Sequence, residues 1–110
     1  MALPHAQPNE PIDVRPLGPA LSTAVSTSLV KSSQLQLMRL VLRAGERVPP
    51  HHVDGEITVH CLEGEIELGV DGQPIPLPAG SLMLVGAGVE HALHARADSS
   101  VLVTVVFLAR

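Results

Sequence analysis

From residue 34 onward the sequence is a series of short apolar segments separated by turn-forming residues. Glycines, prolines and Asp-containing pairs interrupt these segments about every 8–12 residues, a spacing typical of β-sandwiches and barrels. No segment carries a convincing helical period. The chain is therefore predicted to be all-β, with strands over residues 34–43, 57–62, 65–70, 73–78, 81–85, 90–97 and 101–108.

The clearest local signal is a hairpin over residues 65–78. Residues 65–70 alternate between outward and inward positions, as a half-buried strand requires. Asp71 and Gly72 follow, and both tolerate the positive φ angles of a type I′ turn. Prolines then occupy alternate positions of 73–78. Because proline lacks a backbone donor, this segment is predicted to be an edge strand.

The N-terminal segment differs in composition from the rest of the chain. Residues 1–19 hold five of the ten prolines and are predicted to form an extended arm. Residues 20–33 are rich in Ser and Thr and fit either a strand or a short helix. We therefore expect an arm over 1–19 followed by a single domain over 20–110.

Composition excludes several classes of function. The chain has one aromatic residue, Phe107, and no Tyr or Trp, so it lacks the stacking platforms of single-strand nucleic-acid binders. Its net charge of −4 argues against binding a phosphate backbone or an anionic membrane surface. A single cysteine, Cys61, permits no intrachain disulfide, and the first residues lack the pattern of a signal peptide. A cytoplasmic location is the resulting expectation.

Four of the six histidines lie in two short windows. His51 and His52 are adjacent, and His91 and His94 lie about 40 residues further on, each pair next to a predicted strand. Neutral imidazole is the commonest metal ligand in proteins. Glu56 is the carboxylate nearest the first pair. These residues are the candidates for a metal site.

The spacing around these histidines resembles the cupin superfamily. The first cupin motif is Gly, five residues, His-x-His, three or four residues, Glu, six residues, Gly, and this chain offers Gly45, His51-His52, Glu56 and Gly64. The resemblance continues into a second motif.

That second motif is Gly, five residues, Pro-x-Gly, two residues, His, three residues, Asn. Here the matching positions are Gly80, residues 86–88 and His91, with Gly86 in place of Pro and Ala95 in place of Asn. The resemblance spans residues 34–108.

The resemblance implies a fold, a cofactor class and a ligand set. The fold would be a single-domain, RmlC-like cupin jelly-roll β-barrel, also called a double-stranded β-helix. Metal-holding cupins resemble one another in supplying three His and one Glu, so a divalent transition metal (Fe, Mn, Ni or Zn) is expected and no organic cofactor. The predicted metal ligands are His51, His52, Glu56 and His91.

The match to the ligand positions is incomplete. Counting forward from Gly45, the two first-motif histidines fall on His51 and Val53, whereas counting back from Gly64 they fall on Pro50 and His52. The Glu position falls on Ile57, one residue after Glu56.

Which of these residues can bind a metal depends on which side chains point into the barrel. Successive side chains of a regular strand face opposite sides, so His51 and His52 cannot both point inward. A one-residue bulge near residues 49–55 would re-aim Glu56 or a second histidine. Our hypothesis is that His52 and His91, with either His51 or Glu56, bind the metal. The alternatives are a polar loop at 51–52 and a pocket histidine without metal at His91.

A pocket and a partner surface follow from the same strand pattern. Residues 34–43 and 101–108 are apolar on both faces, which predicts a homodimer because a two-layer sandwich buries only one face of each strand. His60 is expected at such an interface and His94 at the surface. The predicted pocket lining is His51 or His52, His91, Val59, Cys61, Val85 and Leu93.

Three functions are compatible with these features. The first is a metal-dependent cupin enzyme, such as an oxygenase or isomerase, acting on a small molecule. The second is a non-catalytic cupin that binds or senses a small-molecule ligand. The third is a metal-free sugar-modifying cupin of the epimerase type, against which the absence of Tyr argues because those enzymes use a Tyr acid. No nucleic-acid or membrane partner is expected, and no catalytic residue is assigned.

Overall fold

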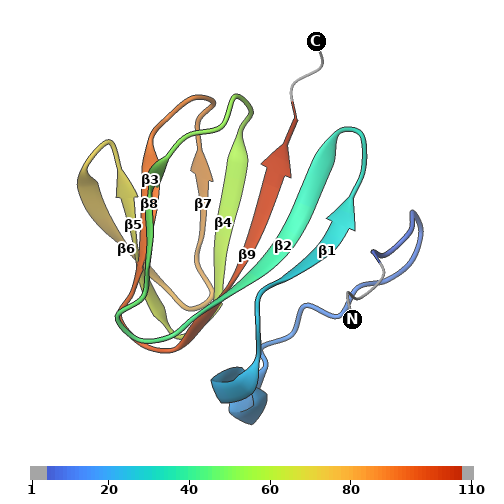
Figure 1. The fold of residues 1–110 in the computed structure, drawn as a ribbon, viewed down its shortest axis with the longest axis horizontal. Helices are drawn as coiled ribbons and strands as arrows, with labels where there is room; N and C mark the ends of the chain where they lie inside the picture. The colour runs from blue at the N-terminus through green and yellow to red at the C-terminus, as the bar shows by residue number, and fades with distance from the viewer. Residues whose placement is uncertain (1–4, 108–110) are drawn as a thin grey trace.

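A computed structural model describes residues 5–107 of the chain (Figure 1). Over these residues the chain forms one short 3-10 helix and nine strands. Their bounds are η1 (Gly18–Thr23), β1 (Thr27–Lys31), β2 (Leu35–Leu42), β3 (Arg47–His51), β4 (Ile57–Glu63), β5 (Glu65–Val70), β6 (Gln73–Pro78), β7 (Leu82–Val85), β8 (His91–Ala95) and β9 (Ser99–Val106).

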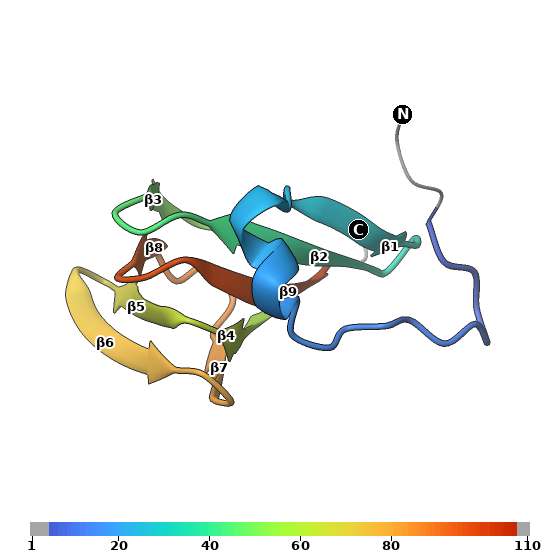
Figure 2. The same ribbon diagram turned by 90° about the horizontal axis from the view of Figure 1, so that it is seen from below.

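The strands form two antiparallel sheets that pack against each other. One sheet has the order β1-β2-β9-β4-β7, and the other has the order β3-β8-β5-β6. Figures 1 and 2 show the two sheets as the walls of a flattened barrel, with β1 and β2 extending beyond the second sheet on one side. The predicted all-β jelly-roll is confirmed.

The hairpin predicted over residues 65–78 is present with the predicted bounds. Asp71 has a φ of 49° and Gly72 a φ of 81°, as a type I′ turn requires. Strand β6 is an edge strand whose prolines are exposed, while Leu77 points into the core at 4% exposure. The edge position therefore accounts for the three prolines, as predicted.

Three segments differ from the sequence-based expectation. Residues 20–33 contain both a helical turn, in η1, and a strand, β1. Strand β3, which includes Pro49 and Pro50, was not predicted, and it too is an edge strand. Strand β9 begins at Ser99, two residues earlier than predicted, and ends at Val106; Leu108 lies outside the described residues.

Between the sheets, cross-strand rows of aliphatic side chains form the core. The lowest row includes Cys61 and Val101, which are register partners, and Ile66 of the other sheet, all with 0% exposure. Burial of one such aliphatic side chain stabilises a fold by about 1.5–3 kcal/mol. The core therefore includes a fully buried level at these three residues.

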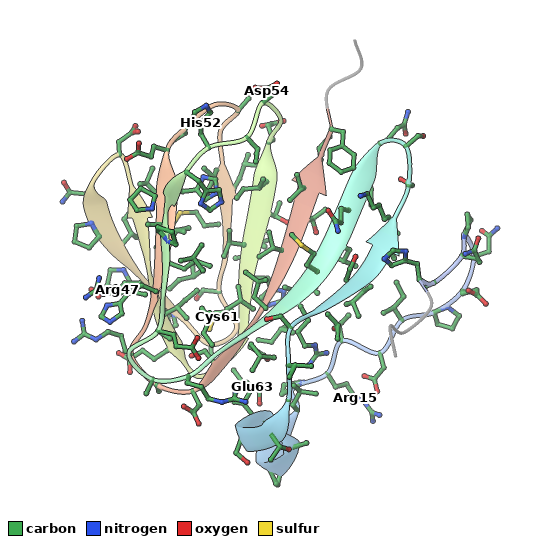
Figure 3. All side chains as sticks on the ribbon, in the orientation of Figure 1. Arg15, Arg47, His52, Asp54, Cys61 and Glu63 are labelled. Atoms are coloured by element: carbon green, nitrogen blue, oxygen red, sulfur yellow. The ribbon has the colours of Figure 1, made fainter. Side chains whose placement is uncertain are left out.

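The N-terminal arm is tied to the outer surface of the five-stranded sheet. Glu63, at the end of β4, accepts hydrogen bonds from the backbone N–H groups of Leu17 (2.7 Å) and Gly18 (3.0 Å) and from the Ser100 hydroxyl. Burial alone raises the pKa of the Glu63 carboxyl, but these hydrogen bonds hold its pKa below the ordinary value. Figure 3 shows Glu63 beside η1. This carboxylate fixes the point where the arm joins the barrel.

Candidate functional site

A cavity of about 430 Å³ lies between the two sheets. That volume is within the range of small-molecule pockets. Three lining residues are polar: Gln36, His51 and His91. The other lining residues are apolar: Met38, Leu40, Val48, Val53, Ile57, Val59, Leu93, Val103, Val105 and Phe107.

The polar lining residues lie at strand ends on the open side of the barrel. Cross-strand register places Gln36 opposite Val105, and Val105 opposite Ile57. On the facing sheet, His51 at the end of β3 is opposite His91 at the start of β8. Deeper rows contain aliphatic side chains. The cavity therefore has a polar mouth and an apolar interior.

A bulge in β3 turns His51 into the cavity. Val48 pairs with Leu93 and His51 pairs with His91, so three steps along β3 match two steps along β8. The extra residue falls at Pro49-Pro50, which lack the backbone donors of a regular ladder. Without it, strand alternation would place Val48 and His51 on opposite faces. A bulge in this region was anticipated, and the residue that it re-aims is His51.

The two histidine rings form a contact pair with fixed orientations. Their centroids are 4.3 Å apart, with an angle of 62° between the ring planes. The Nδ1 atom of His51 lies 3.0 Å from the Pro49 carbonyl oxygen, and that of His91 lies 3.0 Å from the Val89 carbonyl oxygen. Because a carbonyl can only accept, both Nδ1 atoms donate. The Nε2 atom of each ring is left for a ligand.

The other two predicted ligands do not join this pair. His52 and Glu56 are exposed, and Figure 3 shows His52 at the rim, on the connection between β3 and β4. The bulge precedes His51, so alternation afterwards turns His52 outward. Glu56 precedes Ile57, which is 4% exposed and lines the cavity.

The cavity wall also shows which way of counting the first motif applies. His51, Val53 and Ile57 line the cavity, and these are the first-motif positions obtained by counting forward from Gly45; His91, from the second motif, lines it as well. Two of the four ligand positions are therefore aliphatic. Across residues 5–107, no group of three or more His, Cys, Asp or Glu side chains is placed to hold a metal. The residues present do not fit a three-His, one-Glu centre.

Comparison with known proteins supports the resemblance seen in the motifs. Residues 38–107 match the family model of the cupin domain, which is well over half of the chain. The chain belongs to the cupin family. No match was found among curated proteins.

Solved structures share the fold of this cupin. An RmlC-like cupin from Desulfovibrio desulfuricans is 30% identical, with a TM-score of 0.69, and the match covers 74% of this chain and 80% of that one. A conserved protein of unknown function from Streptococcus pyogenes, SPY1581, is 22% identical, with a TM-score of 0.76, covering 100% and 97%.

An enzyme is also among the structural neighbours. Salicylate 1,2-dioxygenase from Pseudoaminobacter salicylatoxidans is 18% identical, with a TM-score of 0.68. The match covers 73% of this chain and 25% of the dioxygenase. At this identity the likeness concerns the fold alone.

Two residues predicted to line the pocket of this cupin lie elsewhere. Cys61 is fully buried and Val85 is 2% exposed, and both belong to the core cluster instead of the cavity wall. Burial raises the pKa of the Cys61 thiol, whose Sγ contacts the Glu63 carbonyl oxygen at 3.5 Å. Cys61 is therefore a packing residue, because the barrel closes below the level of Val59.

The sequence-based pocket omitted the contribution of β2. Gln36, Met38 and Leu40 lie at alternate positions of β2 and line the cavity, whereas the predicted lining included no residue of this segment. The alternation of side chains along a strand predicts that these three residues share one face, but no local sequence pattern indicates that this face packs toward β3 and β8. Phe107 was also missed as a lining residue.

The remaining histidines of the two central strands face outward. His94 lies on the outer face of the four-stranded sheet, where its Nδ1 is 3.3 Å from Glu67 Oε1, and Arg96 donates to the same oxygen at 2.9 Å. His60 is half-buried on β4, opposite Leu82 and Leu102 on the outer face of the five-stranded sheet.

Within residues 5–107, no helix has the length and apolar character needed to cross a membrane.

Proposed function

We propose that this cupin binds a small organic molecule in the barrel cavity, with His51 and His91 as its polar anchors. The observation that carries the proposal is the paired imidazoles, each held by a backbone carbonyl, at the mouth of an otherwise aliphatic cavity. Binding sites of this kind combine an apolar lining with a few convergent polar groups. We also propose a cytoplasmic location, because the buried free thiol of Cys61 is compatible with a reducing compartment.

Metal binding by the same two histidines is the second candidate. A carbonyl acceptor on Nδ1 is the usual outer partner of a histidine that ligates through Nε2, which supports Fe, Mn, Ni or Zn at this position. Two protein ligands leave the site open and weak, since Val53 and Ile57 offer no donor atoms. An oxygenase or isomerase activity would depend on this second candidate.

The probes are 1-octanol and octanoate, and replacing His91 with alanine is expected to weaken binding of 1-octanol by about tenfold, the effect of losing one good hydrogen bond. Met38 lines the cavity and Met83 does not, so the ¹³C-methyl signals of these residues report binding and provide an internal control. The matched control is His94→Ala on the outer face. If Met38 fails to respond to either probe in the wild-type chain, the proposal is wrong.

We also propose that a second copy of the chain covers the outer face of the five-stranded sheet. Leu82 and Leu84 are each 61% exposed there and lie opposite His60 and Thr58, and Val106 is 42% exposed. The outward side chains of β4 from Thr58 to Leu62, and those of β7 and β9, include no Asp, Glu, Lys or Arg, so two such faces bring no like-charged pairs of these residues together. A two-fold pairing is the simplest closed arrangement for one self-complementary face.

Light scattering at micromolar concentration is expected to give the mass of a dimer. Leu84→Lys places an ammonium group in the proposed interface and should shift the mass to that of a monomer, because an unpaired buried charge is costly. The matched control is Pro76→Lys, which places the same ammonium group on the exposed side of β6, away from the proposed interface; the neighbouring Leu77 is unsuitable because it lies in the core. A monomeric wild-type chain would overturn the dimer proposal.

A further inference from the structure

The hydrogen-bonding state of the cavity mouth restricts the head group of a ligand. His51 and His91 each commit Nδ1–H to a backbone carbonyl, so each neutral ring offers one acceptor, Nε2. Gln36 is the third polar residue of the lining. A ligand head that offers acceptors alone would leave these nitrogens unpaired.

Strand β1 holds the Gln36 side chain in place. Its Nε2 donates to the Ser28 hydroxyl oxygen at 3.0 Å, and the same hydroxyl contacts Nε2 of His5, in the N-terminal arm, at 2.9 Å. The amide therefore keeps Oε1 and one N–H for the cavity. Gln36 is an oriented group with both an acceptor and a donor to offer.

The cavity offers no fixed charge to a ligand. Its lining contains no Asp, Glu, Lys or Arg. A carboxylate or ammonium head would give up part of its hydration at the mouth without gaining an ion-pair partner at a pH where the imidazoles are neutral. A hydroxyl group meets the requirements, because it is uncharged and has both a donor for an imidazole Nε2 and an acceptor for an amide N–H.

We infer that the ligand is a neutral alcohol with an apolar tail, and that Gln36 determines this specificity. The hydroxyl binds at the polar mouth of the cavity, and the tail packs on Met38, Val59 and Val103. The inference rests on the proposed cavity function and adds to it the chemical class of the ligand.

Three probes with the same tail and different heads test the inference: 1-octanol, octanoate and octylammonium. At pH 8, where ordinary imidazole side chains are neutral, 1-octanol should bind at least tenfold more tightly than either charged probe, as followed by the Met38 methyl signal. Gln36→Met keeps the side-chain volume and removes the amide. This substitution should lower the 1-octanol affinity by about threefold to tenfold and reduce the ratio of 1-octanol affinity to the affinity for either charged probe. Gln34→Met, at an exposed position, is the matched control and should change nothing.

The possible failures are distinguishable. If none of the three probes moves the Met38 signal, the proposed cavity function itself fails. If a charged probe binds as tightly as 1-octanol, the ligand class is wrong while cavity binding stands. If Gln36→Met keeps the full affinity and preference while His91→Ala loses them, Gln36 has no part in specificity.

Discussion

The double substitution Val53→His, Ile57→Glu is expected to create a tight divalent-metal site in this cupin. Both positions line the same cavity as His51 and His91, so the variant would present three imidazoles and one carboxylate around one space. The wild-type chain, with two ligands, should bind Co²⁺ weakly. We expect at least a hundredfold gain in Co²⁺ affinity, measured by the visible absorption of the bound ion.

Stability should reveal the same site. Ile57 is 4% exposed, and an unpaired carboxylate at a buried position costs several kcal/mol, so the metal-free variant should melt below the wild-type chain. Metal at a hundred times its dissociation constant stabilises the folded state by about 2.7 kcal/mol and should recover much of this loss. The matched control, Val53→His with Thr58→Glu, places the carboxylate on the outer face and should gain little affinity. Equal gains in both variants would contradict the assignment of Ile57 to a ligand position.

Gly64→Ala is expected to be the most destabilising single substitution considered for this chain. Gly64 joins β4 to β5 with a φ of +88°, a region that L-residues avoid. A β-carbon there would overlap the Asp98 carbonyl oxygen and Ser99, which is fully buried. Left-handed strain and forced repacking together should reduce the free energy of unfolding by about 2–5 kcal/mol.

Gly80→Ala separates the backbone strain at positive φ from the crowding of the added β-carbon. Gly80 has nearly the same φ, +87°, but nothing lies within 4 Å of the position that its β-carbon would take. It should therefore show the conformational part alone, about 1–2 kcal/mol. In thermal unfolding, each kcal/mol corresponds to about 4–8 °C in a domain of this size. Equal losses of melting temperature in the two variants would show that crowding at Gly64 has no effect.

Gly55 shows how a turn residue in the sequence acquires a tertiary role. The sequence suggests only a turn or bulge over residues 53–55. In the structure Gly55 is buried, and a β-carbon there would overlap the Val106 backbone. Val106 donates its N–H to the Glu56 carbonyl oxygen at 3.0 Å. A partner 51 residues away in the sequence, which no local pattern identifies, is therefore the reason for glycine.

The candidate site was predicted in part. The second motif located His91 because its spacing is complete, and that side chain lines the cavity. The first motif left His51 and His52 as alternatives. The structure brings His51 to His91, whereas neither His52 nor Glu56 lines the cavity. Neither the ring pair nor the presence of Gln36 in the lining of the same cavity follows from spacing along the chain.

The sequence by itself determined the all-β fold, most strand positions and the 71–72 turn. These features depend on interactions between residues that are close in the chain: alternation of side chains, the positive φ of Asp71 and Gly72, and the missing donors of proline. Only the tertiary structure decided which histidine faces the cavity. That direction depends on the pairing of β3 with β8, which has a bulge at Pro49-Pro50. The extra residue of the bulge reverses the direction of the side chains that follow it, and the identities of those residues do not reveal this.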